Sequence, residues 1–312
     1  MRILLTSTSF QDTPGEHQKL LKETGWDVDY LRGPLLDTSL LPIISKYDGI
    51  ICGDDMITKE VISRGKNGKL KAISKYGIGL DKIDLLAAEQ FHIPVGSTPG
   101  VNHVAVAEHA LAFMLMHFKN IYNEIEFTKK GLWNRLIGHE LAGKKIAIIG
   151  LGRIGRELAI RCAAFSLDTH VFDIEYEKAF LEKYSLNTID SIEDIDNTYD
   201  IISLHIPLSS KTSNIIDAHI LKKLKTNILI INTSRAAIIN KNDLMAFLNT
   251  NNTSAYYTDV LWVEPISTEE TIHKYPNVFI TPHIGSRTYQ SVERQGMAAV
   301  NNLIRLIMNS DE

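Results

Sequence analysis

The feature that most constrains this 312-residue sequence is a glycine-rich turn in mid-chain, G-L-G-R-I-G over residues 150–155. An apolar run at 145–149 precedes the turn and predicts a buried strand, and residues 153–165 predict a helix. A second predicted strand, 169–172, follows. This β-α-β context is what a G-x-G-x-x-G turn requires in order to bind a dinucleotide.

Each glycine of the turn has a separate predicted task. Gly150 permits the tight turn, Gly152 lets the backbone approach a pyrophosphate, and Gly155 lets the helix pack on the strand. The first helical residues, Arg153 and Ile154, lie where unpaired N–H groups and the positive end of the helix dipole favour phosphate. The turn therefore predicts a site for the cofactor's phosphates.

The second strand ends on Asp173, where a carboxylate can bind the ribose hydroxyls of the adenosine. The same carboxylate repels a 2′-phosphate, and Ile174, Glu175 and Tyr176 follow it in place of Arg or Lys. The predicted cofactor is therefore NAD and not NADP.

Composition excludes several classes of protein. The 33 basic and 37 acidic residues give a net charge of −4, so no basic field favours nucleic acid or an anionic membrane. No apolar run approaches the length of a membrane span. The two cysteines, Cys52 and Cys162, lie in apolar settings that suit buried thiols in a reduced compartment better than a disulfide. We expect a soluble cytoplasmic protein.

Strand-like and helix-like segments alternate along the sequence, which indicates an α/β protein with mainly parallel sheets. A stretch rich in Gly and Pro, 94–100, predicts a domain boundary, and a long helix, 104–118, follows it. We predict one domain of residues 1–99 and 286–312 and another of residues 100–285, with the active site in a cleft between them. The predicted strands are 3–6, 48–52, 70–75, 145–149, 169–172, 201–205, 228–232, 255–260 and 278–281, and the predicted helices include 16–24, 153–165, 241–248 and 289–308.

Three predicted strands of the second domain end on residues that could act on a hydroxy acid. Arg235 can hold a carboxylate bidentately, and His283 is a general acid or base near neutral pH. Asp259 and Glu264 follow the strand between them, and a carboxylate beside His283 would orient its ring. Each residue also has an ordinary structural explanation, as a solvated cation, a turn residue or the cap of a loop.

Further motifs recur in a fixed order along nearly the whole chain. They are SKYGIGLDKID at 74–84, TPGVNHVAVAE at 98–108, HIPLSSKT at 205–212, NTSR at 232–235, the segment 259–265 and TPHIGS at 281–286. Together with the glycine-rich turn they resemble the D-isomer specific 2-hydroxyacid dehydrogenases. The segment GLWNR before ELAGK is most similar to the phosphoglycerate dehydrogenase-like branch, here without its C-terminal regulatory domain.

The resemblance implies two doubly wound parallel-sheet domains, a flavodoxin-like substrate domain and a Rossmann NAD-binding domain, and a homodimer formed through the latter. It implies that Arg235, Glu264 and His283 are catalytic and that no metal is needed. Substrate contacts are expected from Lys75, Tyr76, Gly77, Ile78 and Gly79, together with Arg235 and His283. The cofactor-binding residues implied are Gly150, Gly152, Arg153, Ile154, Gly155, Asp173, His205, Pro207, Thr212, Thr233, Asp259 and Gly285.

Two departures from the family pattern affect the site. Ala236 and Ala237 stand where the family usually has two glycines after the arginine, and Lys75 stands where it often has arginine. Lys75 and Arg135 are either contacts for a phosphate or second acidic group of the substrate, or solvated surface cations.

The predicted reaction is hydride transfer between NAD and a D-2-hydroxy acid or its 2-oxo acid. The substrate is 3-phosphoglycerate or, alternatively, hydroxypyruvate or glyoxylate. An NAD(H)-sensing interaction protein on the same scaffold is the alternative from another class. A formate dehydrogenase is disfavoured because those enzymes resemble this pattern with Gln at the position of Glu264.

Overall fold

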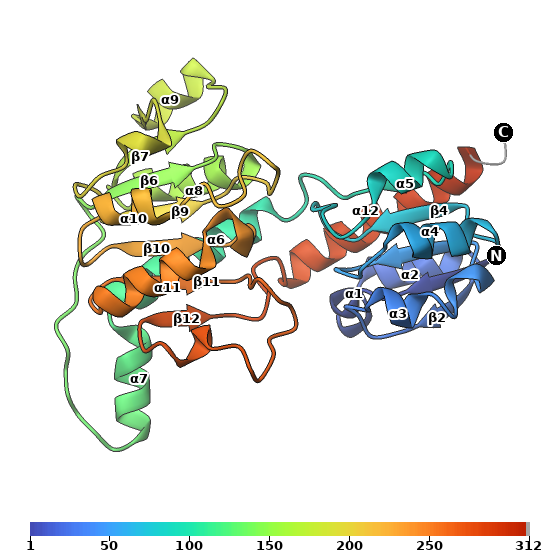
Figure 1. Cartoon of the computed structure of the whole chain (residues 1–312), viewed down its shortest axis with the longest axis horizontal. Coiled ribbons are helices and arrows are strands. Elements are labelled where there is room, and N and C mark those ends of the chain that lie inside the picture. The colour runs from blue at the N-terminus through green and yellow to red at the C-terminus, as the bar shows by residue number, and fades with distance from the viewer. Residues whose placement is uncertain (310–312) are drawn as a thin grey trace. The chain divides into compact units, whose positions relative to one another are not determined.

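The structure is a computed structural model that describes residues 1–309, so the end of the predicted segment 286–312 lies outside the described residues. The chain divides into two compact units (Figure 1). Unit 1 consists of residues 1–102 and the segment from Ser286 onward, and unit 2 is His103–Gly285. Each unit holds its own parallel sheet flanked by helices, so the predicted α/β class with two parallel-sheet domains is confirmed.

Unit 1 is built on a five-stranded sheet. Its strands are β1 (Arg2–Leu5), β2 (Asp27–Tyr30), β3 (Gly49–Cys52), β4 (Ala72–Lys75) and β5 (Val95–Gly96). They pair in the order β2-β1-β3-β4-β5, and every pair is parallel. This is the flavodoxin-like order, in which the chain reverses direction across the sheet between β1 and β3.

The last helix of the chain completes unit 1. The helices of the unit are α1 (Thr8–Asp12), α2 (Glu16–Glu23), α3 (Asp37–Leu40), α4 (Lys59–Lys66), α5 (Leu85–Gln90) and α12 (Tyr289–Asn309). In Figure 1 α12, in red, runs along the sheet that the first hundred residues build. Its residues Val300, Leu303 and Ile307 join Ile3 and Ile51 in one buried cluster.

Unit 2 is built on a seven-stranded sheet. Its strands are β6 (Lys145–Ile149), β7 (Asp168–Phe172), β8 (Asn187–Thr188), β9 (Ile201–Leu204), β10 (Leu229–Asn232), β11 (Ala255–Thr258) and β12 (Val278–Ile280). The order is β12-β11-β10-β9-β6-β7-β8, and all pairs are parallel. The chain leaves β6 toward β7 and returns on the other side as β9, which is the Rossmann arrangement.

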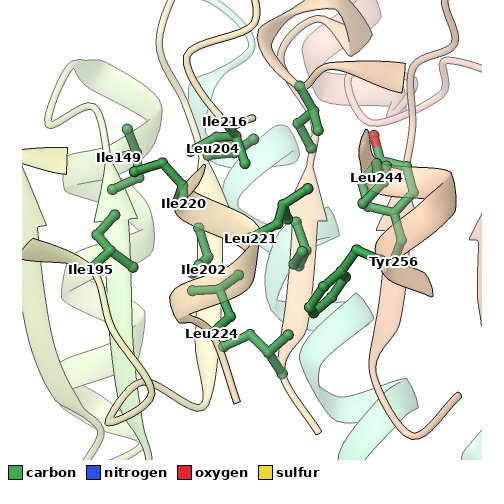
Figure 2. Packing of buried hydrophobic residues seen from close by; sticks show 14 of the residues in the cluster. Ile149, Ile195, Ile202, Leu204, Ile216, Ile220, Leu221, Leu224, Leu244 and Tyr256 are labelled. Atoms are coloured by element: carbon green, nitrogen blue, oxygen red, sulfur yellow. The ribbon is translucent and has the colours of Figure 1, made fainter. Parts of the chain in front are cut away.

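Helices cover both faces of this sheet. They are α6 (His103–Phe118), α7 (Ile121–Lys129), α8 (Arg153–Ala164), α9 (Lys178–Tyr184), α10 (Ala218–Lys223) and α11 (Lys241–Thr250). α6 and α8 contribute to the buried cluster on one face, and α10 and α11 to the cluster on the other. Figure 2 shows the second cluster, where Ile220 and Leu221 of α10 pack with Ile202 and Leu204 of β9.

Burial on both faces explains why the inner strands are so apolar. β6 reads KIAII, β9 IISL and β10 LIIN, and their residues are buried except Lys145 at the start of β6. A strand of a parallel sheet that is covered by helices on both sides needs apolar residues at successive positions. Cys52 and Cys162 are buried free thiols, as predicted. No helix within residues 1–309 combines the length and apolar character needed to cross a membrane.

The structure adds elements that the sequence did not predict. β2, β5 and β8 lie at or next to sheet edges, where partly exposed strands lack a continuous apolar run. β5 falls inside the stretch 94–100, which was predicted only as a boundary. α11 continues to Thr250, so the predicted surface turn 249–253 begins two residues too early.

The contact between α12 and α2 gives a test of this packing. A Cβ at Gly296 would lie 2.6 Å from Cβ and Cγ of His17, which is itself fully buried. Gly296→Ala should therefore push α12 away from α2 and lower the free energy of unfolding by about 1–3 kcal/mol in a urea titration. Asn301→Ala, at an exposed position of the same helix, should change it by less than about 0.5 kcal/mol.

Candidate active site

Two glycines of the turn after β6 are required by the packing of the protein itself. Gly150 has φ +102°, and a Cβ there would lie 2.6 Å from the carbonyl oxygen of His205, which follows β9. A Cβ at Gly155 would lie 1.9 Å from the carbonyl oxygen of Gly150. Any side chain at either position would force the turn away from α8 or β9.

The middle glycine has a different environment. Gly152 is exposed, and a Cβ there would meet no heavy atom of the described chain within 4 Å. It is the N-cap of α8 and provides no side chain to bond the N–H groups of the first turn, where Arg153 is also exposed. Accessible N–H groups at the N-terminus of a twelve-residue helix are suited to bind phosphate.

Asp173 lies beside this turn, directly after β7. Its Oδ2 accepts a hydrogen bond from the N–H of Leu151 at 2.5 Å, and its Oδ1 accepts one from the N–H of Ile174 at 2.6 Å. The backbone thus fixes the carboxylate next to the glycine-rich turn, where the sequence predicted it.

The ends of β9 and β10 carry polar groups that are buried and lack partners. Nδ1 of His205 and Oγ1 of Thr233 have no hydrogen-bond partner among residues 1–309, although Nε2 of His205 lies 2.8 Å from Oγ of Ser203. Burial lowers the pKa of His205 to about 3, so its imidazole is neutral at physiological pH.

The loop after His205 is held together by a threonine. Oγ1 of Thr212 donates to the carbonyl of Pro207 at 2.6 Å and accepts from the N–H of Ser209 at 2.8 Å. Buried polar atoms normally have partners, so the two unpaired atoms at this edge and the open Gly152 fit a polar cofactor bound along it. The residues present thus suit the predicted dinucleotide.

A histidine–glutamate pair stands at the same edge of the sheet. Nδ1 of His283, which follows β12, lies 2.9 Å from Oε2 of Glu264, which follows β11. Oε1 of Glu264 accepts the N–H of Leu261 at 2.8 Å, which fixes the carboxylate. The side chain of His283 is 33% exposed, so its ring remains accessible.

Arg235 follows β10, the next strand in the sheet. Its Nη1 donates to the carbonyl of Ser234 at 2.8 Å, and the residue is half-buried. Ala236 and Ala237 begin a 3-10 turn, a conformation that alanine adopts without strain, so glycine is not needed there. Arg235, Glu264 and His283 therefore come from the carboxyl ends of three adjacent strands.

A buried aspartate anchors the loop that carries His283. Oδ1 of Asp259 accepts hydrogen bonds from Oγ1 of Thr281 at 2.6 Å and the N–H of Ile284 at 2.8 Å, and Oδ2 accepts the N–H of Gly285 at 2.7 Å. His283 itself has φ +54°, a left-handed conformation that is unfavourable for a non-glycine residue. Anchors on both sides hold it there.

His109 of α6 extends this network and was not predicted as part of it. Its Nε2 lies 3.0 Å from Oγ1 of Thr281 and 3.7 Å from Oδ1 of Asp259. Because the Thr281 hydroxyl donates to Asp259, it accepts from His109. Burial lowers the pKa of His109, and the nearby Asp259 opposes that shift. The sequence analysis placed His109 only on an exposed turn or at an interface.

The predicted substrate loop lies in unit 1, after β4. Lys75 is buried and paired with Asp54, so its interpretation as a solvated surface cation was wrong. The side chain of Tyr76 is also buried, which leaves only its backbone for a ligand, whereas Ile78 is 40% exposed. Gly77 has φ +131° and its N–H donates to Oγ1 of Thr98.

Comparison with known proteins identifies the fold and the site together. A model of the family "D-isomer specific 2-hydroxyacid dehydrogenase, NAD binding domain" matches residues 111–285, which lie in unit 2. The chain belongs to the D-isomer specific 2-hydroxyacid dehydrogenase family. The NAD-binding domain of this family is therefore the part of the chain that carries the glycine-rich turn and the His283–Glu264 pair.

Relatives within the family cover different shares of their own length. Hydroxypyruvate reductase of Thermotoga maritima is 34% identical over 273 residues, which is 85% of this chain and 87% of that protein. D-3-phosphoglycerate dehydrogenase of Archaeoglobus fulgidus is 30% identical over 92% of this chain, but the chain spans only 54% of its length. The crystal structure of the TT0316 protein from Thermus thermophilus matches with a TM-score of 0.87 and 30% identity, over 99% of this chain and 97% of that one.

The two kinds of glycine in the turn can be separated experimentally. Gly155→Ala should lower the free energy of unfolding by about 1–3 kcal/mol, because its Cβ has no room. Gly152→Ala should change it by less than about 0.5 kcal/mol, because nothing in the described chain meets its Cβ.

The same Gly152→Ala variant should weaken NADH binding at least about tenfold, which corresponds to about 1.4 kcal/mol. Unfolding titrations and NADH fluorescence titrations measure the two effects. Unchanged NADH affinity in Gly152→Ala would contradict the assignment of this glycine to the cofactor.

Proposed function

We propose that this chain is an NAD-dependent dehydrogenase that interconverts a D-2-hydroxy acid and its 2-oxo acid. The observation that carries the proposal is the 2.9 Å contact between His283 and Glu264, at the same sheet edge as Arg235. This combination supplies a proton donor, an anion that orients it and a cation for a carboxylate.

In the proposed site the cofactor is held by the glycine-rich turn and by the loops that follow the neighbouring strands. When bound, the nicotinamide supplies the hydride in reduction and accepts it in oxidation. The proposed cofactor-binding residues are Gly150, Gly152, Arg153, Ile154, Gly155, Asp173, His205, Pro207, Thr212, Thr233, Asp259 and Gly285.

His283 moves the proton. Its Nδ1–H donates to Glu264, which fixes the ring and leaves Nε2 to face the substrate oxygen. In reduction the protonated Nε2 gives its proton to the carbonyl oxygen while the carbon receives a hydride. In oxidation the neutral Nε2 takes the hydroxyl proton. The Glu264 carboxylate stabilises the imidazolium form that reduction requires.

The remaining residues bind the acid. The guanidinium of Arg235 pairs with the substrate carboxylate and polarises the oxygen that His283 protonates. The loop from Lys75 through Tyr76, Gly77 and Ile78 to Gly79 contributes substrate contacts from unit 1, through backbone groups and the exposed Ile78. The resulting substrate is a small 2-oxo acid or 2-hydroxy acid.

Replacing the proton donor tests the proposed reaction. His283→Gln keeps a polar side chain but has no group that exchanges a proton, so kcat for NADH oxidation with a 2-oxo acid should fall at least about 100-fold. NADH affinity, measured by fluorescence titration, should change little. The control is His273→Gln, an exposed histidine of the same unit, which should leave both values unchanged.

Glu264→Gln provides a second reading of the same pair. Without the carboxylate the imidazole holds its proton less strongly, so the pH above which reduction declines should move downward. An unchanged pH profile would contradict the pairing. Tight NADH binding without turnover of glyoxylate, hydroxypyruvate, other 2-oxo acids or formate would favour an NAD(H)-sensing protein instead.

We also propose that the protein is a homodimer formed through unit 2 and that it works in the cytoplasm. The buried thiols of Cys52 and Cys162 are compatible with a reducing compartment. α7 and the segment after it extend away from the sheet of unit 2 (Figure 1). Seven of their apolar residues are between 41% and 93% exposed, namely Ile121, Tyr122, Ile125, Leu132, Trp133, Leu136 and Ile137. An exposed apolar surface of this kind is typical of an interface.

A charge placed on this surface tests the homodimer. Ile137→Glu should convert the dimer to a monomer in sedimentation velocity, because the side chain is 93% exposed in one chain and would be buried by a second. Leu86→Glu, at an 80% exposed position of unit 1, should leave the dimer intact. A wild-type protein that sediments as a monomer would contradict the proposal.

A further inference from the structure

Lys75 and Asp54 follow two neighbouring strands of unit 1. β3 ends at Cys52, which is paired across the sheet with Lys75, the last residue of β4. Both charged residues therefore lie at the carboxyl edge of the parallel sheet, the edge at which ligands of open α/β sheets bind. Their charges influence which substituent a substrate can present to this edge.

The ammonium group of Lys75 is paired within unit 1. Its Nζ lies 2.7 Å from Oδ1 of Asp54 and also donates to the carbonyl oxygen of Gly53. The side chain of Lys75 is 3% exposed, whereas that of Asp54 is 39% exposed. The cation of the pair is buried and the anion is accessible, so a ligand at this position would meet the carboxylate first.

A second carboxylate adds to the negative charge of this loop. Asp55 is fully buried, and its oxygens accept hydrogen bonds from Oγ1 of Thr6 at 2.5 Å, the N–H of Leu35 at 2.6 Å and the N–H of Gly53 at 2.9 Å. These donors hold Asp55 inside the loop. The formal charges of Asp54, Asp55 and Lys75 therefore sum to a net negative charge at the ends of β3 and β4.

Two arginines of unit 1 lie at a different part of this edge. Nη2 of Arg32 is paired with Oδ2 of Asp12 at 2.9 Å, and Arg287 donates to the hydroxyl of Thr8. Thr8 follows β1, and β3 separates β1 from the strand that carries Lys75. These cations are therefore not the immediate neighbours of the Asp54–Lys75 pair.

We propose that Asp54 determines specificity by selecting against a phosphorylated 2-oxo acid. A phosphate could reach the ammonium of Lys75 only by displacing Asp54, and it would bring its negative charge against that carboxylate. A hydroxyl or a hydrogen at the same position meets no such repulsion, and a hydroxyl can donate to Asp54. The substrate class is thus a small, unphosphorylated 2-oxo acid. The inference rests on the proposed dehydrogenase activity.

Paired substrates that differ only in the phosphate test this directly. Initial rates of NADH oxidation are measured with glyoxylate, hydroxypyruvate and 3-phosphohydroxypyruvate. In the wild-type protein kcat/KM for hydroxypyruvate should exceed that for 3-phosphohydroxypyruvate at least about tenfold. Raising the salt concentration should reduce this ratio, because salt screens repulsion at the partly exposed Asp54.

Asp54→Asn identifies the residue responsible. The amide keeps the size of the side chain but removes its charge, so the preference for hydroxypyruvate should fall at least about tenfold. Lys75→Met in the Asp54→Asn background should cancel the gained activity with the phosphorylated acid. Glu60→Gln, which removes an exposed charge from α4, is the matched control and should leave the preference unchanged. Binding of 3-phosphohydroxypyruvate to the NAD complex, measured by calorimetry, gives a second readout for each variant.

The possible results separate this inference from the function on which it rests. No NADH oxidation with any of the three acids would overturn both. A wild-type enzyme that uses 3-phosphohydroxypyruvate as well as hydroxypyruvate, or better, would overturn the inference alone and would assign phosphate binding to Arg287 or another cation. An unchanged preference in a folded Asp54→Asn variant, with unchanged calorimetric affinity for the phosphorylated acid, would also overturn it.

Discussion

Parallel pairing of the strands is the constraint on which the rest of unit 2 depends. It brings the carboxyl ends of β6, β9, β10, β11 and β12 to one edge, so that loops distant in sequence become neighbours. The glycine-rich turn, Arg235, Glu264 and His283 all follow strands that are almost completely buried. Helices on both faces leave the strand ends as the place where polar side chains can meet a ligand. The chemistry of the site is therefore set by the residue that follows each strand.

Buried carboxylates stabilise the loops at this edge in both units. Asp259 accepts the N–H groups of Ile284 and Gly285 in unit 2, and Asp55 accepts those of Leu35 and Gly53 in unit 1. Backbone N–H groups in irregular loops have no partners from a sheet or helix, and a carboxylate can accept several of them. One buried aspartate can thus define the shape of a loop that has no regular secondary structure. In unit 2 that loop carries the residue proposed to transfer the proton.

The sequence was informative where local rules decide the structure. The apolar runs at 145–149 and 228–232 predicted buried strands, and the glycine pattern predicted a tight turn and a helix start, because these depend on a few adjacent residues. The pairing of Lys75 with Asp54 depends on the register of β3 against β4, and an Asp-Asp sequence after a strand resembles an ordinary turn. His109 gave no signal either, since one histidine in an apolar helix says nothing about the strand opposite. The partnership of Glu264 with His283 came from the family resemblance and was not evident from spacing.

The place of α12 has a consequence for the order in which the protein can be made. Unit 1 begins at the first residue, yet Val300, Leu303 and Ile307 of α12 cover Ile3 and Ile51 of its sheet. During synthesis the whole of unit 2 emerges from the ribosome before this helix does. Domains generally fold as units, with those nearer the N-terminus folding first. Here the nucleotide-binding unit is complete earlier, while one apolar face of the N-terminal sheet waits for the end of the chain. A chaperone that binds the nascent protein would find its apolar target there.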